Sequence, residues 1–268
     1  EQEEMKWWQP VNVNIKQEMM PAVLPFTHVK ADSCEPIDIT SAFNASVTDI
    51  YRNEYLSPRS PYTTLQLPKQ GIGEWCHPTL TADIDDSGMR ALVRDGLLST
   101  NLGVSFRTPE KGNNIAFTSL WDNYPDSLTV SLKGKASRAY LLMAGSTNHM
   151  QCHIDNGLIR VYYKDGTCDK MALRNPDNWA PIEHIFFEDG LAFNRHAPAL
   201  YRLRLKIGEI SNNFGEELGF PGASRELDGG AAILLEMPLN PDKKLSHLVL
   251  ETLSNDVVIG LMGITLQR

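Results

Sequence analysis

The stretch GLIRVYYKDGTCDKMAL, residues 157–173, predicts a β-hairpin and with it the fold class. Two strand-like runs flank the four residues Lys164, Asp165, Gly166 and Thr167. The Asp-Gly step supplies the positive φ that a tight hairpin turn requires. We therefore expect two antiparallel strands joined by this turn.

Further strands are predicted on both sides of this hairpin. ALYRLRLKI, residues 199–207, alternates with a period of two, which predicts one buried face and one face in water. The buried face would hold Tyr201, Leu203, Leu205 and Ile207, and the wet face Arg202, Arg204 and Lys206. Five more apolar runs also predict strands: SLTVSL (127–132), RAYLLMAG (138–145), AAILLEM (231–237), SHLVLETL (246–253) and VVIGLMGITL (257–266). Because no strand–helix–strand alternation with a phosphate-binding glycine loop accompanies them, we expect an all-β protein.

Other segments set the domain organisation. Residues 1–35, with Pro10, Pro21 and Pro25, predict an extended N-terminal arm whose Trp7 and Trp8 pack against a neighbouring surface. Residues 36–268 predict one β-sandwich with few short helices. Within it, residues 40–56 fit either a short helix, with Phe43, Val47, Ile50 and Tyr51 at helical spacing, or an irregular loop.

Charge and cysteine content exclude several classes of function. The chain has 268 residues and a net charge of −8, and its Lys and Arg residues form no basic stripe, so we expect no nucleic-acid partner. No run approaches the roughly 20 apolar residues of a membrane span. Cys34, Cys76, Cys152 and Cys168 lack the CxxC spacing of a zinc knuckle. They could form two disulfides, one or none, and we favour free, buried cysteines.

Several segments together resemble the galactose-binding-domain-like jelly rolls found beside glycoside hydrolases. The resemblance is carried by IDITSAFNAS (37–46), LGVSFRTP (102–109), SLTVSLKGKASRAYLLMAGS (127–146) and VLETLSNDVVIGLMGITL (249–266). A second resemblance, in SPRSPYTTLQLPKQGIGEWCHP (57–78) and NNIAFTSLWDNYPDSLTV (113–130), is to the C-terminal region of large exported proteins of gut anaerobes. The preceding part of those proteins looks like an (α/α) glycosidase toroid.

These resemblances imply a function but supply no site residues. They imply an antiparallel jelly-roll β-sandwich, secreted or periplasmic, that accompanies an upstream glycosidase-like domain. We expect a non-catalytic module that binds a glycan. Two alternatives stay open: the module braces the absent catalytic domain, or it is itself a glycosidase or esterase.

Aromatic and polar clusters give the candidate glycan-binding residues. An aromatic ring covers the apolar C–H face of a sugar while neighbouring polar groups bind its hydroxyls. Three groups have this composition: Trp121, Asp122, Asn123 and Tyr124; Asn148 and His149, after the apolar run that stops at Gly145; and Trp75 with His77. Structural roles are the alternative for each: a plug at the end of the sandwich for the first, loop closure for the second and a crossing turn for the third.

Charged clusters raise three further hypotheses. Asp83, Asp85 and Asp86 could supply oxygens to a structural calcium ion, although Asp-Ser-Gly is also a favoured turn. The segment RNPDNWAPIEHIFFEDG (174–190) holds Trp179, Glu183, Glu188 and Asp189, whose carboxylates could serve glycoside hydrolysis if two of them faced each other. The histidines His77, His149, His153, His184 and His196 show no ligand spacing, so no zinc site is expected.

Overall fold

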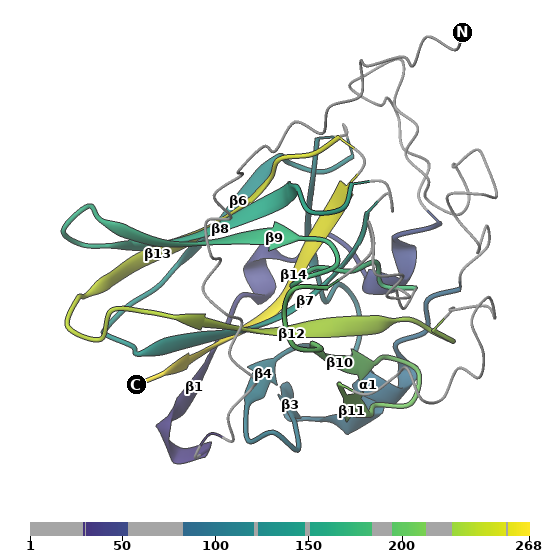
Figure 1. Cartoon of the computed structure of the whole chain (residues 1–268). Helices are drawn as coiled ribbons and strands as arrows, with labels where there is room; N and C mark the ends of the chain where they lie inside the picture. The colour runs from purple at the N-terminus through teal and green to yellow at the C-terminus, as the bar shows by residue number, and fades with distance from the viewer. Residues whose placement is uncertain are drawn as a thin grey trace, which may run out of the picture.

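Antiparallel β-sheet dominates the structure, as expected for an all-β protein (Figure 1). The computed structural model describes residue 29 and residues 31–52, 83–120, 123–147, 151–183, 195–212, 227–255 and 257–268. Every pair of named strands within these ranges is antiparallel. No helix in the described part of the chain is long and apolar enough to cross a membrane.

The larger sheet is built around three long apolar strands. β7 (Arg138–Thr147) lies between β14 (Val257–Gln267) and β12 (Ala231–Pro238), and almost all their residues are buried. Both faces of this sheet are therefore covered by other parts of the chain. Shorter strands complete it: β1 (Cys34–Ile37) and β5 (Ala116–Ser119) pair with β14, and β10 (Tyr201–Arg204) and β11 (Ile210–Ser211) lie beyond β12.

The smaller sheet contains the hairpin predicted from residues 157–173. Its strands run in the order β6 (Ser127–Ser131), β13 (Leu245–Thr252), β8 (Asp155–Tyr163) and β9 (Cys168–Arg174). The turn between β8 and β9 places Gly166 at φ +85°, and the Asp165 carboxylate accepts the backbone N–H of Thr167. The hairpin prediction is confirmed, as are the five additional strands.

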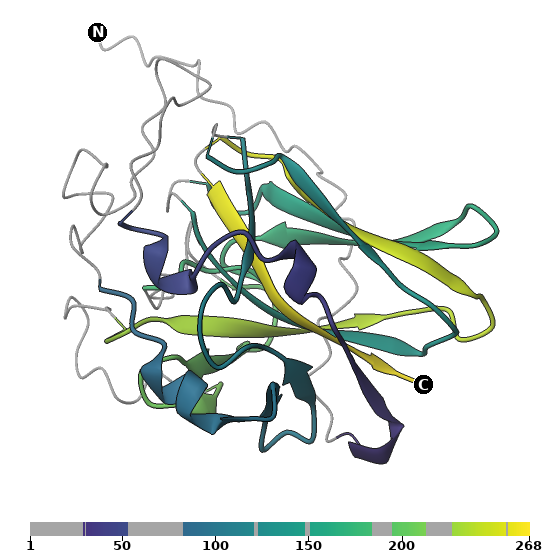
Figure 2. The ribbon, with the colours of Figure 1, turned by 180° about the vertical axis from the view of Figure 1, so that it is seen from behind.

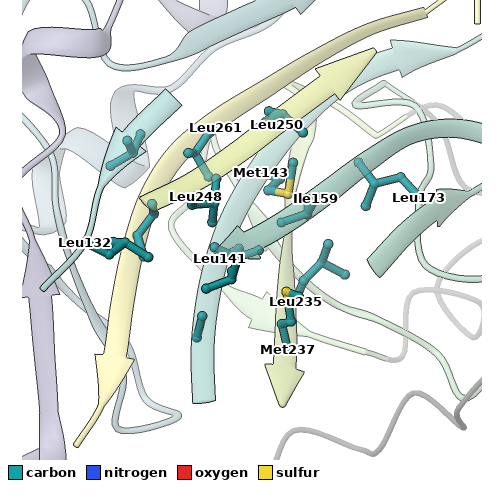
Figure 3. Packing of buried hydrophobic residues seen from close by; sticks show 14 of the residues in the cluster. Leu132, Leu141, Met143, Ile159, Leu173, Leu235, Met237, Leu248, Leu250 and Leu261 are labelled. Atoms are coloured by element: carbon teal, nitrogen blue, oxygen red, sulfur yellow. The ribbon is translucent and has the colours of Figure 1, made fainter. Parts of the chain in front are cut away.

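Two apolar cores lie on opposite faces of the larger sheet. Alternate residues of β7 separate them: Leu141 and Met143 face the smaller sheet, whereas Leu142 and Ala144 face the other side. Figure 3 shows the first core, where Leu141 and Met143 lie among side chains of the smaller sheet, including Leu248 of β13. Each fully buried leucine contributes roughly 1.5–3 kcal/mol to the free energy of folding, so these two cores supply most of the stabilisation that comes from burying apolar side chains.

The second core is covered by short elements from the first half of the chain: η3 (Val47–Asp49), α1 (Ser87–Leu92), β2 (Val93–Arg94), β3 (Leu97–Ser99) and β4 (Ser105–Arg107). Two other short turns, η1 (Ala31–Ser33) and η2 (Thr40–Ala42), flank β1, and η2 has no buried residue. Seen from behind, the purple N-terminal turns and β1 lie along the yellow strand β14 (Figure 2). Residues 40–52 form neither an α-helix nor a plain loop but two 3₁₀ turns, and Ile50 and Tyr51 are buried in the second core.

Two details of the predicted strands are wrong. β7 does not stop at Gly145 but continues through Ser146 and Thr147, which are buried where they pair with β14. The alternation expected for residues 199–207 forms only in part: Leu203 and Leu205 are buried and Lys206 is exposed, but β10 ends at Arg204. Arg202 is buried and donates to the carbonyls of Pro181 and Ala231, whereas Ile207 is 46% exposed.

The structure also shows the state of three cysteines and the surroundings of the predicted N-terminal boundary. Among the described residues, Cys34, Cys152 and Cys168 are half-buried and form no disulfide with one another, and Cys76 lies outside the described residues. The boundary placed between residues 35 and 36 falls inside β1, which begins at Cys34. Val29 packs against the second core. The remainder of the predicted arm, with Trp7 and Trp8, lies outside the described residues.

Candidate functional sites

The aromatic group at residues 121–124 is divided by the structure. Tyr124 is 8% exposed, and its ring centroid lies 5.1 Å from that of Phe117 in the second core. A ring packed in this way does not offer its face to a sugar. Asn123 is half-buried, and Trp121 and Asp122 lie outside the described residues. The stacking role predicted for Trp121 stays a prediction.

The other glycan candidates fall on segments that the structure does not describe. Asn148 and His149 follow the last described residue of β7, and Trp75 and His77 belong to the range 53–82. The described residue nearest to the first pair, Thr147, donates from Oγ1 to the Oδ1 atom of Asn156 at 2.8 Å. Thr147 thus holds the end of β7 to the start of β8.

The three aspartates proposed for calcium have separate structural roles. The Asp83 side chain is 83% exposed and lies 3.8 Å from Arg52. Asp85 accepts the N–H of Ser87 at 2.9 Å, and hydrogen bonds from Ser87 hold the pKa of the Asp85 carboxyl below its ordinary value. Asp86 is 6% exposed and forms part of the second core's boundary.

Asp86 joins α1 to the loop before β5. Its Oδ2 atom accepts Arg90 Nε and Asn114 Nδ2, both at 2.8 Å. Because these contacts and those of Asp83 and Asp85 are made to different neighbours, the three carboxylates do not converge on one point. Among the described residues they form no group that could hold a metal ion.

The carboxylate predicted at Glu183 is a core group. Glu183 is fully buried, and its Oε2 accepts a hydrogen bond from the hydroxyl of Tyr51. The guanidinium of Arg202 is buried nearby; burial lowers the pKa of Arg202 to about 10, while the charge of Glu183 opposes that change. Glu183 therefore joins β10 to the 3₁₀ turns. Glu188 and Asp189, its proposed catalytic partners, lie outside the described residues.

A pocket that the sequence did not indicate lies between α1, β3 and the β10–β11 hairpin. Its volume is about 390 Å³. Apolar walls come from Leu92, Leu98, Leu203 and Ile210, and polar lining from Asn101 and Glu209, among others. Within the described ranges the side chains of Asn101 and Glu209 form no hydrogen bond with the protein, so both are available to a ligand.

The structure also brings together three residues that the sequence left apart. His153, Asp177 and His196 each offer a ligand atom, and these atoms all lie within 4.8 Å of one another. His153 and His196 show no ligand spacing in the sequence, yet the fold brings their side chains together. No spacing rule could have found the group, because His153 comes from the β7–β8 connection whereas Asp177 and His196 come from opposite ends of the β9–β10 connection.

Comparison with known proteins assigns no function to this chain. No protein-family model matches the chain, and no curated protein is significantly similar to it. What the fold defines is the class: an all-β protein in which two antiparallel sheets pack face to face. The galactose-binding-like resemblance stays a prediction.

Proposed function

We propose that this chain is a non-catalytic, glycan-binding module of the galactose-binding-like jelly-roll type, belonging to a larger exported glycan-processing protein. The observation that carries the proposal is the pocket between α1, β3 and the β10–β11 hairpin. It combines aliphatic walls with the side chains of Asn101 and Glu209, which make no hydrogen bond to the described part of the protein. That combination suits a sugar, which has an apolar C–H face and a ring of hydroxyls.

The chemistry of the lining favours binding over hydrolysis. The Asn101 amide both donates and accepts hydrogen bonds, and the Glu209 carboxylate accepts from vicinal hydroxyls. Glycoside hydrolysis ordinarily needs two carboxyl groups across the scissile bond. Glu209 is the one carboxylate among the residues that line this pocket. It would therefore orient a sugar without cleaving it.

The walls of the pocket are held in place by the backbone. On the β3 side, Thr100 Oγ1 donates to the Val104 carbonyl at 2.6 Å. On the other side, the N–H of Arg204 donates to the Glu209 carbonyl at 2.7 Å, which closes the β10–β11 turn. A pocket formed before the ligand arrives loses less entropy on binding.

The test is to titrate the purified chain with plant and host polysaccharides and to monitor binding by tryptophan fluorescence and by calorimetry. We expect one glycan class to bind saturably, and Asn101→Ala and Glu209→Gln each to weaken binding about tenfold, the loss of one hydrogen bond to the ligand. Asp242→Asn, an exposed change in the β12–β13 turn, is the control and should bind as wild type.

Two outcomes would redirect the proposal. If only Trp121→Ala weakens binding, the glycan function stands and the pocket is the wrong site. If no glycan binds, the function is refuted. The bracing role would then be tested by adding the upstream glycosidase-like domain in trans.

A further inference from the structure

Two connecting segments, the β7–β8 connection and the β9–β10 connection, meet around one buried carboxylate. His153 lies between β7 and β8, Asp177 follows β9, and His196 precedes β10. Asp177 is 4% exposed. Its Oδ2 lies 3.6 Å from His153 Nδ1, and its Oδ1 lies 3.6 Å from His196 Nδ1. The two imidazole rings therefore flank the carboxylate, and their centroids are 4.6 Å apart.

Backbone hydrogen bonds hold the two histidines in this position. The N–H of His153 donates to the Asn175 carbonyl at 2.7 Å, and the N–H of His196 donates to Asp177 Oδ1 at 2.7 Å. His153 has φ +56°, a left-handed conformation uncommon for a residue other than glycine. Strained backbone of this kind persists where the surrounding structure fixes it, and it concentrates at functional sites.

The side-chain polar groups here are not satisfied by the protein. His153 Nε2 is buried and has no hydrogen-bond partner in the described part of the chain. The neighbouring Gln151 Oε1 and Asn175 Oδ1 atoms are in the same condition. Buried polar groups in folded proteins are normally paired, so the unpaired ring nitrogen of His153 is consistent with a ligand at this imidazole.

We propose that His153, Asp177 and His196 bind a divalent transition-metal ion of the zinc class. Zinc bonds of about 2.0–2.1 Å to nitrogen and oxygen place two tetrahedral ligand atoms roughly 3.3–3.4 Å apart. The two Nδ1-to-carboxylate distances are 3.6 Å, each to a different oxygen of Asp177, so small side-chain movements would bring the ligands to this spacing. Two imidazoles with one carboxylate suit zinc and its neighbours, whereas calcium takes six or more oxygens.

The geometry also specifies what kind of metal site this is. The His196 side chain is 52% exposed, whereas Asp177 is buried, so one side of the group faces solvent. Three protein ligands leave a fourth position for water or an external ligand. The bound ion would tie together the connections that flank β8, β9 and β10. This site is independent of the glycan pocket, and either proposal can fail alone.

The experiment is a calorimetric titration of the chelator-treated full chain with Zn²⁺, and with Ca²⁺ as the hard-cation comparison. We expect one Zn²⁺ per chain at micromolar affinity or tighter, and no binding of Ca²⁺. His196→Ala and Asp177→Asn should each weaken Zn²⁺ binding by about 100-fold or more. His196→Ala is the principal variant, because its exposed side chain can be removed without opening the core.

His247→Ala is the matched control. His247 lies on the smaller sheet, where its ring stacks on Tyr162 at 4.7 Å, so its loss should leave Zn²⁺ affinity unchanged. A second readout is the visible absorption of Co²⁺, which we expect in wild type and not in His196→Ala. The proposal is overturned if the wild type binds no Zn²⁺. It is equally overturned if His196→Ala and Asp177→Asn bind Zn²⁺ as wild type does, because the ligands would then lie elsewhere.

Discussion

Adjacent leucines on β7 provide a direct test of the two-core arrangement. Leu141 belongs to the core between the sheets and Leu142 to the core on the opposite face, and both are fully buried. Truncating a buried leucine to alanine removes its burial energy and leaves a cavity, at a cost of about 2–5 kcal/mol. We therefore expect Leu141→Ala and Leu142→Ala each to lower the free energy of unfolding by this amount.

The assay is chemical denaturation of both variants, supported by thermal melts. At about 2–4 °C per kcal/mol in a chain of this size, each melting temperature should fall by roughly 4–20 °C. Leu253→Ala, at a position 40% exposed, is the control and should change stability by less than about 0.5 kcal/mol. If Leu142→Ala behaves like this control, the second face of the sheet is not packed and the two-core description is wrong.

Three further predictions concern single side chains. Gly145→Ala should lower the free energy of unfolding by about 1–3 kcal/mol or more, because the Cβ of the new alanine would lie 2.0 Å from the Val258 carbonyl oxygen. An unchanged melting temperature in a thermal melt would contradict this contact. Asp86→Asn should lower the free energy of unfolding by about 1–3 kcal/mol, since it weakens two hydrogen bonds at a buried carboxylate. The control, Asp83→Asn at an exposed position, should change the free energy of unfolding by less than about 0.5 kcal/mol. Equal losses in the two variants would count against the structural role of Asp86. Burial and its hydrogen bond to Asp169 raise the pKa of Tyr163 to about 12. The unfolded tyrosine ionises near about pH 10, so this contribution to stability is complete below that pH and is lost as the pH rises to about 12. Tyr163→Phe should flatten that part of the stability curve, and a slope equal to that of the wild type would refute the assignment.

Much of the sheet structure could be predicted because its signals are local. Asp165-Gly166 marks the turn of the hairpin, and the long apolar runs mark β7, β12 and β14. The pairing of strands that are distant in sequence has no such local signal, and this pairing decides which side chains are buried. Arg202 has the period of a solvent-facing residue, yet it is buried, and its guanidinium donates to the backbone carbonyls of Pro181 and Ala231.

The sites were harder to predict for the same reason. Tyr124 has the composition of a sugar-binding residue in sequence, but its packing on Phe117 makes it part of the core. His153 and Asp177 come together only because the connections around β8 and β9 pack against each other at Asn175. A group assembled from separate connections leaves no spacing in the sequence.

The central claim is that this module binds a glycan and does not cleave it. The most direct measurement is to incubate the chain with the polysaccharide panel and follow binding and the release of reducing ends in the same samples. The account predicts saturable binding of one glycan class, lost in Glu209→Gln, with no reducing ends released. Release of reducing ends by the purified chain, abolished by a single carboxylate substitution, would contradict it.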